Sequence, residues 1–139
     1  MRQPDTNTLR ESVAQQRKAL MGLLREPLRR LAEVCREAWP DRGRLNEALA
    51  ATLKELPYCK HLYVVNAHHV QISDNVAHDG LRAGFGRDRS DRPYMQGLVR
   101  GAAVVLSESY ISLKEGRPSL TALRTVRGEH GEVLGHIGA

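Results

Sequence analysis

The residues with the densest chemical potential stand in one short segment, Asp88-Arg89-Ser90-Asp91-Arg92-Pro93-Tyr94-Met95. Arg92 carries a planar guanidinium that can make two parallel hydrogen bonds to a carboxylate or a phosphate. Tyr94 can donate a phenolic hydrogen bond to the same group. Asp88 or Asp91 can orient the arginine or meet a ligand amine. Together these side chains can anchor a small anionic ligand.

A second polar set follows in a segment with alternating character. Tyr110 and Ser112 are two positions apart, so in a strand both side chains lie on one face and can line one pocket. Thr121 can do the same on a neighbouring strand. An architectural interpretation stays open, in which Asp88 and Arg92 form a salt bridge that pins their loop.

The segment around Arg92 resembles the D-x-S-x-R-P-Y-F segment of Cache sensor domains, which are PAS-like ligand-binding modules of bacterial receptors. Two further stretches, Leu106–Ser112 and Arg117–Ala122, are similar to the central strands of that fold. The resemblance covers about residues 62–139. It implies that Arg92 and Tyr94 anchor a ligand carboxylate at the side of a small pocket.

Other chemistries find weaker support in the sequence. Histidines are dense between residues 61 and 78, but no H-E-x-x-H or C-x-x-C spacing accompanies them, so we expect neither a metal site nor a cofactor. No serine stands in G-x-S-x-G, and Cys59 with His61 two residues away is a weak signal for a nucleophile. We therefore expect no enzyme, with a small hydrolase as an open alternative.

Helices are predicted for the N-terminal part, residues 1–57. Apolar residues recur at helical spacing over residues 9–38, and a shorter segment at 45–56 repeats the pattern. Pro27 stands inside the first run, where a proline removes a hydrogen bond and clashes with the preceding turn. Either one bent helix or two separate helices would satisfy this pattern.

The second part, residues 58–139, changes to the period-two patterns of strands. We expect a turn, a long loop and a short helix among the strands. The expected strands lie at 61–66, 70–73, 102–113, 119–127 and 132–138, the turn at 66–69, the loop at 74–91 and the helix at 93–100. Helices followed by about five strands predict an α+β fold with a PAS-like antiparallel sheet. Both parts would form one structural unit.

Composition and charge are those of one globular domain. The chain has 139 residues, of which 41% are hydrophobic, and a net charge of +5. Cys35 and Cys59 form no disulfide framework, which favours reduced thiols in the cytoplasm. Neither a signal peptide nor a membrane-spanning segment is expected. Acidic residues interrupt the basic ones of the first helix, so we expect no nucleic-acid binding.

These observations predict a cytoplasmic sensor domain for signal transduction that binds a small polar metabolite without turnover. The ligand would be an amino acid or an organic carboxylate, with Arg92 and Tyr94 on its acid group and Tyr110 and Ser112 on the opposite wall. A homodimer through the apolar stripe of the first helix is expected, with a signalling partner protein as the output. The alternative from another class is a dimeric interaction or scaffold protein with a filled PAS-like core.

Overall fold

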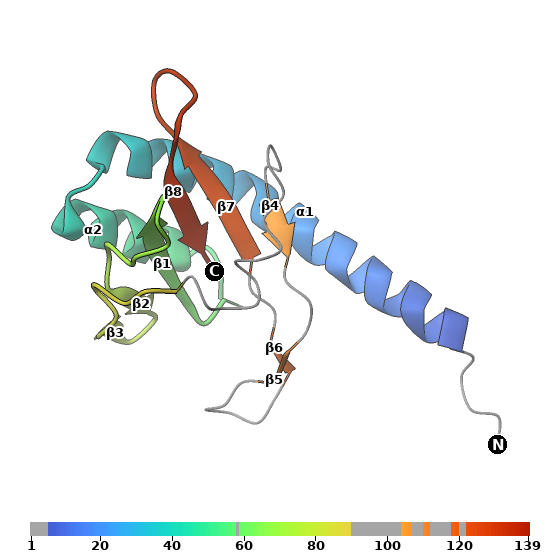
Figure 1. The fold of residues 1–139 in the computed structure, drawn as a ribbon. Helices are drawn as coiled ribbons and strands as arrows, with labels where there is room; N and C mark the ends of the chain where they lie inside the picture. The colour runs from blue at the N-terminus through green and yellow to red at the C-terminus, as the bar shows by residue number, and fades with distance from the viewer. Residues whose placement is uncertain (1–5, 58, 90–103, 107–109, 112–117, 120–121) are drawn as a thin grey trace.

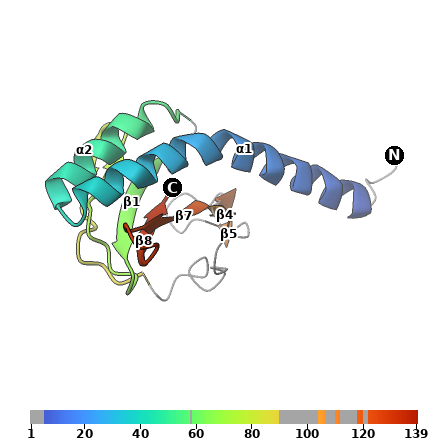
Figure 2. The same cartoon turned by 90° about the horizontal axis from the view of Figure 1, so that it is seen from above.

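A computed structural model of the chain describes residues 6–57, 59–89, 104–106, 110–111, 118–119 and 122–139. Two helices come first, α1 at Thr6–Ala38 and α2 at Arg42–Leu53. They lie side by side on one face of an antiparallel sheet, and the N-terminal turns of α1 project beyond the sheet (Figure 1, Figure 2). The predicted order of helices before a sheet is confirmed.

One continuous helix, α1, runs through Pro27, so the interpretation with two separate helices is wrong. A proline cannot donate the hydrogen bond that a helical residue makes to the carbonyl four positions earlier. Packing compensates, because Leu24, Leu28 and Leu31 are at most 4% exposed in the core under the helix. Burying one leucine stabilises by about 1.5–3 kcal/mol. Three of them outweigh the roughly 3 kcal/mol that an interior proline costs.

The second helix, α2, begins earlier than the expected start at Leu45, because Asp41 caps it. The Asp41 carboxylate accepts a hydrogen bond from the Arg44 N–H at 3.0 Å, which satisfies one of the unpaired N–H groups of the first turn. Leu45, Leu49 and Leu53 then fall on one buried face of the helix. The cap therefore fixes the point at which the chain turns from α1 into α2.

The main sheet has the strand order β3-β2-β1-β8-β7-β4, and neighbouring strands are antiparallel. Its members are β1 (His61–Asn66), β2 (Asn75–Ala77), β3 (Gly80–Arg82), β4 (Val104–Leu106), β7 (Ala122–Arg127) and β8 (Val133–Gly138). A separate two-stranded ladder joins β5 (Tyr110–Ile111) to β6 (Pro118–Ser119). The five neighbouring strands β2, β1, β8, β7 and β4 form the expected PAS-like sheet, and β3 adds a further strand at the β2 edge.

One core cluster joins both helices to the sheet, and the strand register decides which side chains belong to it. Val64 of β1 pairs with Ile137 of β8, and both are fully buried in this cluster. In the adjacent row Tyr63 pairs with Gly138, which pairs in turn with Leu123. Because successive side chains of a strand point to opposite faces, this second row lies on the face away from the helices.

Two expectations before residue 91 are wrong. The strand expected at 70–73 forms only isolated bridges. Ser73 interrupts the ladder, because its Oγ accepts the hydrogen bond of the Val64 N–H at 2.8 Å, where strand pairing would use a backbone carbonyl. The loop expected at 74–91 contains the hairpin of β2 and β3, whose polar turn residues hid two short strands. The helix expected at 93–100 lies outside the described residues.

The C-terminal strands follow the prediction closely. Both β7 and β8 lie within their expected ranges, and the turn between them is closed by a hydrogen bond from the Gly128 N–H to the Glu132 carbonyl oxygen at 2.9 Å. The strand expected at 102–113 contains both β4 and β5. The alternating pattern was therefore sufficient for the hairpin of β7 and β8, but it did not separate β4 from β5, which belong to different sheets.

Candidate ligand-binding face of the sheet

The side chains chosen from the sequence are only partly covered by the structure. Tyr110 is placed in β5 by its backbone, opposite Ser119 in β6, and its side chain is outside the described part of the chain. Asp88 is exposed, and its backbone forms an isolated antiparallel bridge with Val70. The other four lie outside the described residues: Arg92, Tyr94, Ser112 and Thr121. The roles of all six in a site stay predictions.

The sheet face turned away from α1 has an aromatic ring packed over a glycine. Tyr63 of β1 stands opposite Gly138 of β8. A Cβ on Gly138 would come 2.2 Å from the Cζ of Tyr63, so only a glycine lets the phenol ring lie this close to β8. Tyr63 is 2% exposed and Leu123, the next residue in the row, is 1% exposed. This face is therefore an interior surface of the molecule.

A buried cation, Arg89, belongs to the same face. It is 6% exposed, and its guanidinium carbon lies 4.2 Å from the centroid of the Tyr63 ring. Its Nε donates to the Gln71 Oε1 at 2.7 Å, and its Nη2 donates to the Asn75 Oδ1 at 3.2 Å. Arginines are almost never buried unless they are paired. The ring and the two amides hold this positive charge in a fixed place.

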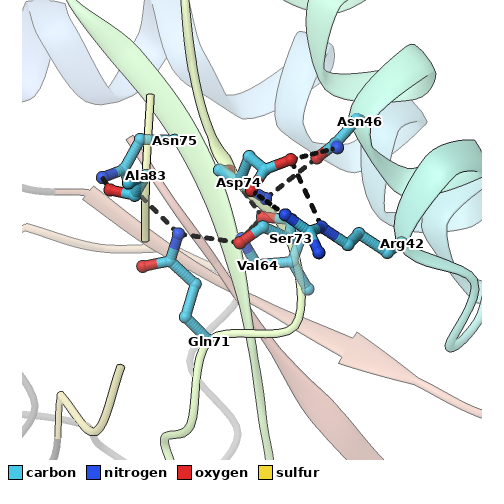
Figure 3. A network of polar contacts seen from close by, with 8 residues as sticks. All are labelled: Arg42, Asn46, Val64, Gln71, Ser73, Asp74, Asn75 and Ala83. Carbon is cyan, nitrogen blue, oxygen red and sulfur yellow. Dashed lines mark hydrogen bonds and ion pairs between the residues drawn. The ribbon is translucent and has the colours of Figure 1, made fainter. Parts of the chain in front are cut away.

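A chain of buried amide contacts supports the arginine. The Gln71 side chain is fully buried, and its Nε2 donates to the Ser73 carbonyl oxygen at 2.9 Å and to the Asn75 Oδ1 at 3.1 Å (Figure 3). Gly84 leaves room for it, because a Cβ there would lie 2.5 Å from the Gln71 Nε2. Since a buried amide needs partners for its polar atoms, this arrangement fixes the group that holds Arg89.

The polar network reaches α2 through Asp74. Its Oδ1 accepts from the Arg42 Nη2 at 2.7 Å, and its Oδ2 accepts from the Asn46 Nδ2 at 2.8 Å (Figure 3). The hydrogen bonds from Arg42 hold the pKa of the Asp74 carboxyl below its usual value; burial opposes this, and Asn46 adds to it. The Arg42 guanidinium also lies 4.3 Å from the centroid of the Phe85 ring. These contacts tie the first turn of α2 to the segment before β2.

A buried imidazole, His136, shares the face of the sheet that faces away from α1. It stands in β8 between Val65 of β1 and Thr125 of β7. It is 8% exposed, and within the described part of the chain its Nδ1 is buried without a hydrogen-bond partner. Burial lowers the pKa of His136 below its usual value, and the nearby His69 and Arg127 lower it further. The ring is therefore neutral at pH 7.

The surroundings of Cys59 bear on the hydrolase alternative. Its Sγ donates to the His61 carbonyl oxygen at 3.3 Å, and the His78 Nε2 lies 2.7 Å from the Cys59 carbonyl oxygen rather than from the sulfur. Burial raises the pKa of the Cys59 thiol, which disfavours the thiolate that a nucleophile needs. Among the described residues no three histidine, cysteine or carboxylate side chains gather as metal ligands.

Sequence reasoning passed over three buried polar residues of this region: Gln71, Arg89 and His136. Arg89 stands inside the segment that was chosen for Arg92. A signal for Arg89 was available, because side chains alternate in an extended segment and Arg89 therefore points to the side opposite Asp88. For Gln71 and His136 no local signal exists, since strands from elsewhere in the chain bury them.

Comparisons of sequence give no relatives. No family model matches this chain. No curated protein matches it either.

Solved structures do resemble its fold. The sensory domain of the Campylobacter jejuni chemoreceptor Tlp3 with isoleucine bound gives a TM-score of 0.69 at 10% identity, covering 95% of this chain and 54% of that one. The ligand-binding domain of the Pseudomonas fluorescens chemoreceptor CtaA in complex with L-isoleucine gives 0.64 at 17% identity, covering 93% and 51%. An extracellular ligand binding receptor from Desulfohalobium retbaense gives 0.64 at 17% identity, covering 90% and 23%.

The likeness is one of fold, and it agrees with the sensor-domain fold that the sequence resemblance implies. This chain spans about half or less of the length of those structures.

Proposed function

We propose that this chain is a sensor domain that binds a small polar metabolite, an amino acid or another organic carboxylate, and does not transform it. The observation that carries the proposal is the buried guanidinium of Arg89, fixed by Gln71, Asn75 and the Tyr63 ring on an interior face of the sheet. A fixed cation on such a face favours an anionic ligand. The similar chemoreceptor domains with isoleucine bound lend support from the fold.

The residues that would touch the ligand are those predicted from the sequence. Arg92 and Tyr94 hold its acid group, and Tyr110 and Ser112 line the opposite wall. Asp88 completes the set as a partner for the arginine or for a ligand amine, and Thr121 lines the pocket from a neighbouring strand. Arg89 then acts beside them as a positioning residue, because Gln71 and Asn75 occupy its Nε and Nη2.

Signalling would follow from a difference in ligand affinity between two conformations of the domain. Both helices share one core cluster with the sheet, so a change of the sheet reaches α1. The polar tie from Arg42 and Asn46 to Asp74 gives α2 a second connection. A homodimer and a downstream signalling protein remain part of the proposal.

The scaffold alternative is favoured by one observation. Tyr63, Val65 and Leu123 are at most 2% exposed, as they would be in a filled core. Under that alternative Arg92 pairs with Asp88 and contributes to stability in the absence of any ligand. The two functions therefore predict different behaviour of the same substitution.

We also propose that the domain lies in the cytoplasm. No helix of the described residues is long and apolar enough to cross a membrane. Cys35 and Cys59 are both free and buried, which fits the cytoplasmic location expected from the sequence. One similar structure is an extracellular receptor, so localisation of the tagged full chain is the measurement that decides this point.

The test of the function combines a metabolite screen with three variants. Thermal melts are recorded with a panel of amino acids and organic acids, and calorimetry then measures the affinity of the best compound. Replacing Arg92 with Ala should weaken binding by roughly 2–5 kcal/mol, because the bound carboxylate loses its partner. Arg92→Lys should recover only part of the loss, since an ammonium cannot reproduce the planar fork. Arg87→Ala, an exposed arginine in the same segment, is the matched control.

The outcomes separate the two functions. A ligand-induced rise in melting temperature that Arg92→Ala abolishes and Arg87→Ala preserves supports the sensor. A large fall in melting temperature of ligand-free Arg92→Ala, together with no response of the wild type to any compound, supports the scaffold.

A further inference from the structure

His136 has an unmet hydrogen-bonding capacity in a buried place. Its side chain is 8% exposed, and its Nδ1 has no partner among the described residues. Buried polar atoms nearly always have a hydrogen-bond partner, because an unpaired one costs free energy. An atom of this kind on an interior face marks a position where a ligand atom can supply the missing bond.

The position of His136 relates it to the proposed ligand site. It stands two residues before Gly138 in β8, and both belong to the face away from α1. Two residues along a strand span roughly 7 Å, a distance that one small amino acid can bridge. His136 therefore lies one row along the sheet from the Tyr63 ring and the Arg89 guanidinium that covers it.

The groups around His136 favour the neutral ring. His69, in the turn after β1, meets it edge-on with 6.0 Å between ring centroids, and Arg127 of β7 contributes a positive charge. Its strand neighbours Val65 and Thr125 carry no charge. In the commoner tautomer of a neutral imidazole the proton is on Nε2, which leaves Nδ1 as an acceptor. The missing partner is then a hydrogen-bond donor.

We propose that the Nδ1 of His136 accepts a hydrogen bond from the ammonium group of a bound amino acid, whose carboxylate lies towards the arginine-bearing part of the face. This inference rests on the proposed function and assigns to it an amine subsite. A carboxylate would meet the lone pair of Nδ1 unfavourably, whereas an ammonium supplies the donor that the ring lacks.

The test pairs two probes with two variants of His136. L-valine and α-ketoisovalerate have the same carboxylate and the same side chain, and only L-valine carries the ammonium group. His136→Leu removes the acceptor, whereas His136→Asn offers an amide oxygen near the place of Nδ1. His130→Leu removes an exposed histidine of the turn between β7 and β8 and is the matched control. Calorimetry with the full chain measures the affinity of all four proteins for both probes. The pH is 7.5 or above, on the order of one unit above the usual histidine pKa, so that the ring is neutral.

The expected result is a coupling between the residue and the ammonium group. His136→Leu should weaken L-valine binding by about tenfold or more and change binding of α-ketoisovalerate by less than about twofold. His136→Asn should restore part of the L-valine affinity, and His130→Leu should leave both affinities unchanged. Wild-type binding of L-valine that His136→Leu does not alter would overturn the inference and leave the proposed function intact. Binding of neither probe by the wild type would overturn the amine subsite together with an amino-acid function.

Two further readouts do not depend on the stability of the leucine variant. Wild-type protein with nitrogen-labelled histidine should show a shift of the His136 Nδ1 resonance when L-valine is added, and an unchanged resonance in saturated protein would contradict the proposal. The affinity of the wild type for L-valine should also fall as the pH is lowered through the depressed pKa of His136, because a protonated ring has no acceptor. A His69→Gln variant that keeps this pH dependence assigns it to His136.

Discussion

Replacing Asp74 with Asn keeps the shape of the side chain and removes its charge. Asp74 accepts from Arg42 through both oxygens, at 2.7 Å to Oδ1 and 3.3 Å to Oδ2, and Oδ2 also accepts from Asn46 at 2.8 Å. Whichever way the new amide is oriented, its NH₂ group faces at least one of these donors. The substitution therefore breaks the polar tie between α2 and the segment before β2.

The size of the effect follows from the burial of the two partners. The Asp74 side chain is 11% exposed and the Arg42 side chain 52% exposed, so Arg42 recovers water after the change while the site of Asp74 does not. A hydrogen bond to a charged group contributes about 1.5–3 kcal/mol. We expect Asp74→Asn to lower the free energy of unfolding by about 2 kcal/mol, because the exposed partner Arg42 limits the loss. An unfolding entropy of about 2.1 cal/mol/K per residue converts this to roughly 7 °C in melting temperature.

The matched control is Asp79→Asn, the same chemical change at the surface. Asp79 pairs with Arg82 at i,i+3, and the two side chains are 69% and 59% exposed. Such a pair contributes less than about 1 kcal/mol, so its loss should lower the melting temperature by no more than about 3 °C. Thermal melts by circular dichroism at neutral pH compare the two variants with the wild type.

The dependence on pH adds a second criterion. Because the pKa of Asp74 in the folded protein lies below its usual value of 3.8, its stabilisation is complete above that value and is lost as the pH falls through the folded pKa. The stability difference between wild type and Asp74→Asn should therefore shrink under acidic conditions, where Asp74 is itself neutral. Equal destabilisation by Asp74→Asn and Asp79→Asn, or a difference that persists in acid, would refute the reasoning.

Two further predictions concern packing. Gly138→Ala should destabilise the fold by about 1–3 kcal/mol, because the new Cβ would lie 2.2 Å from the Tyr63 Cζ. Gly22→Ala on α1 has open space around the new Cβ and should stabilise the fold by about 0.5–1 kcal/mol. Urea unfolding compares the two variants, and an unchanged stability of Gly138→Ala would contradict the close packing. The apolar stripe that was expected to form a homodimer is covered at Leu24 and Leu28 by the chain's own core, so we expect a homodimer through the part of α1 that includes Leu23, which is 58% exposed. Light scattering at micromolar concentration should give twice the monomer mass and a lower mass for Leu23→Asp, and a wild-type monomer would exclude the dimer.

Local patterns in the sequence were sufficient for the elements whose partners stand nearby. The apolar spacing of Leu45, Leu49 and Leu53 predicts α2, and the β-branched run in His61–Asn66 predicts β1. The turn residues around Gly131 predict the hairpin of β7 and β8. From these the α+β class followed, because the period of a sequence reports one buried face without any knowledge of what covers it.

The predicted site depends on a family-like segment rather than on geometry. Arg92 and Tyr94 were chosen for their chemistry and their resemblance to sensor domains, and their roles stay predictions. The same segment contains Arg89, but nothing in the local sequence distinguishes it from the neighbouring arginines as the buried one. Its burial is a consequence of the backbone bridge from Asp88 to Val70 and of the hydrogen bond that its N–H donates to the His69 carbonyl oxygen at 2.9 Å.

The sequence by itself determined which residues can form helices and strands, and therefore the class of the fold. Only the tertiary structure decided that Pro27 stays inside one helix and that Gln71 lies in the interior. It also decided that His136 stands on the face of Tyr63 rather than under the helices. For Pro27 the physical reason is the packing of α1 in the core. For His136 it is strand register, because a shift of one residue exchanges the two faces of a strand. That register is set by the pairing of β8 with β7, its hairpin partner, and with β1, which lies far away in the chain.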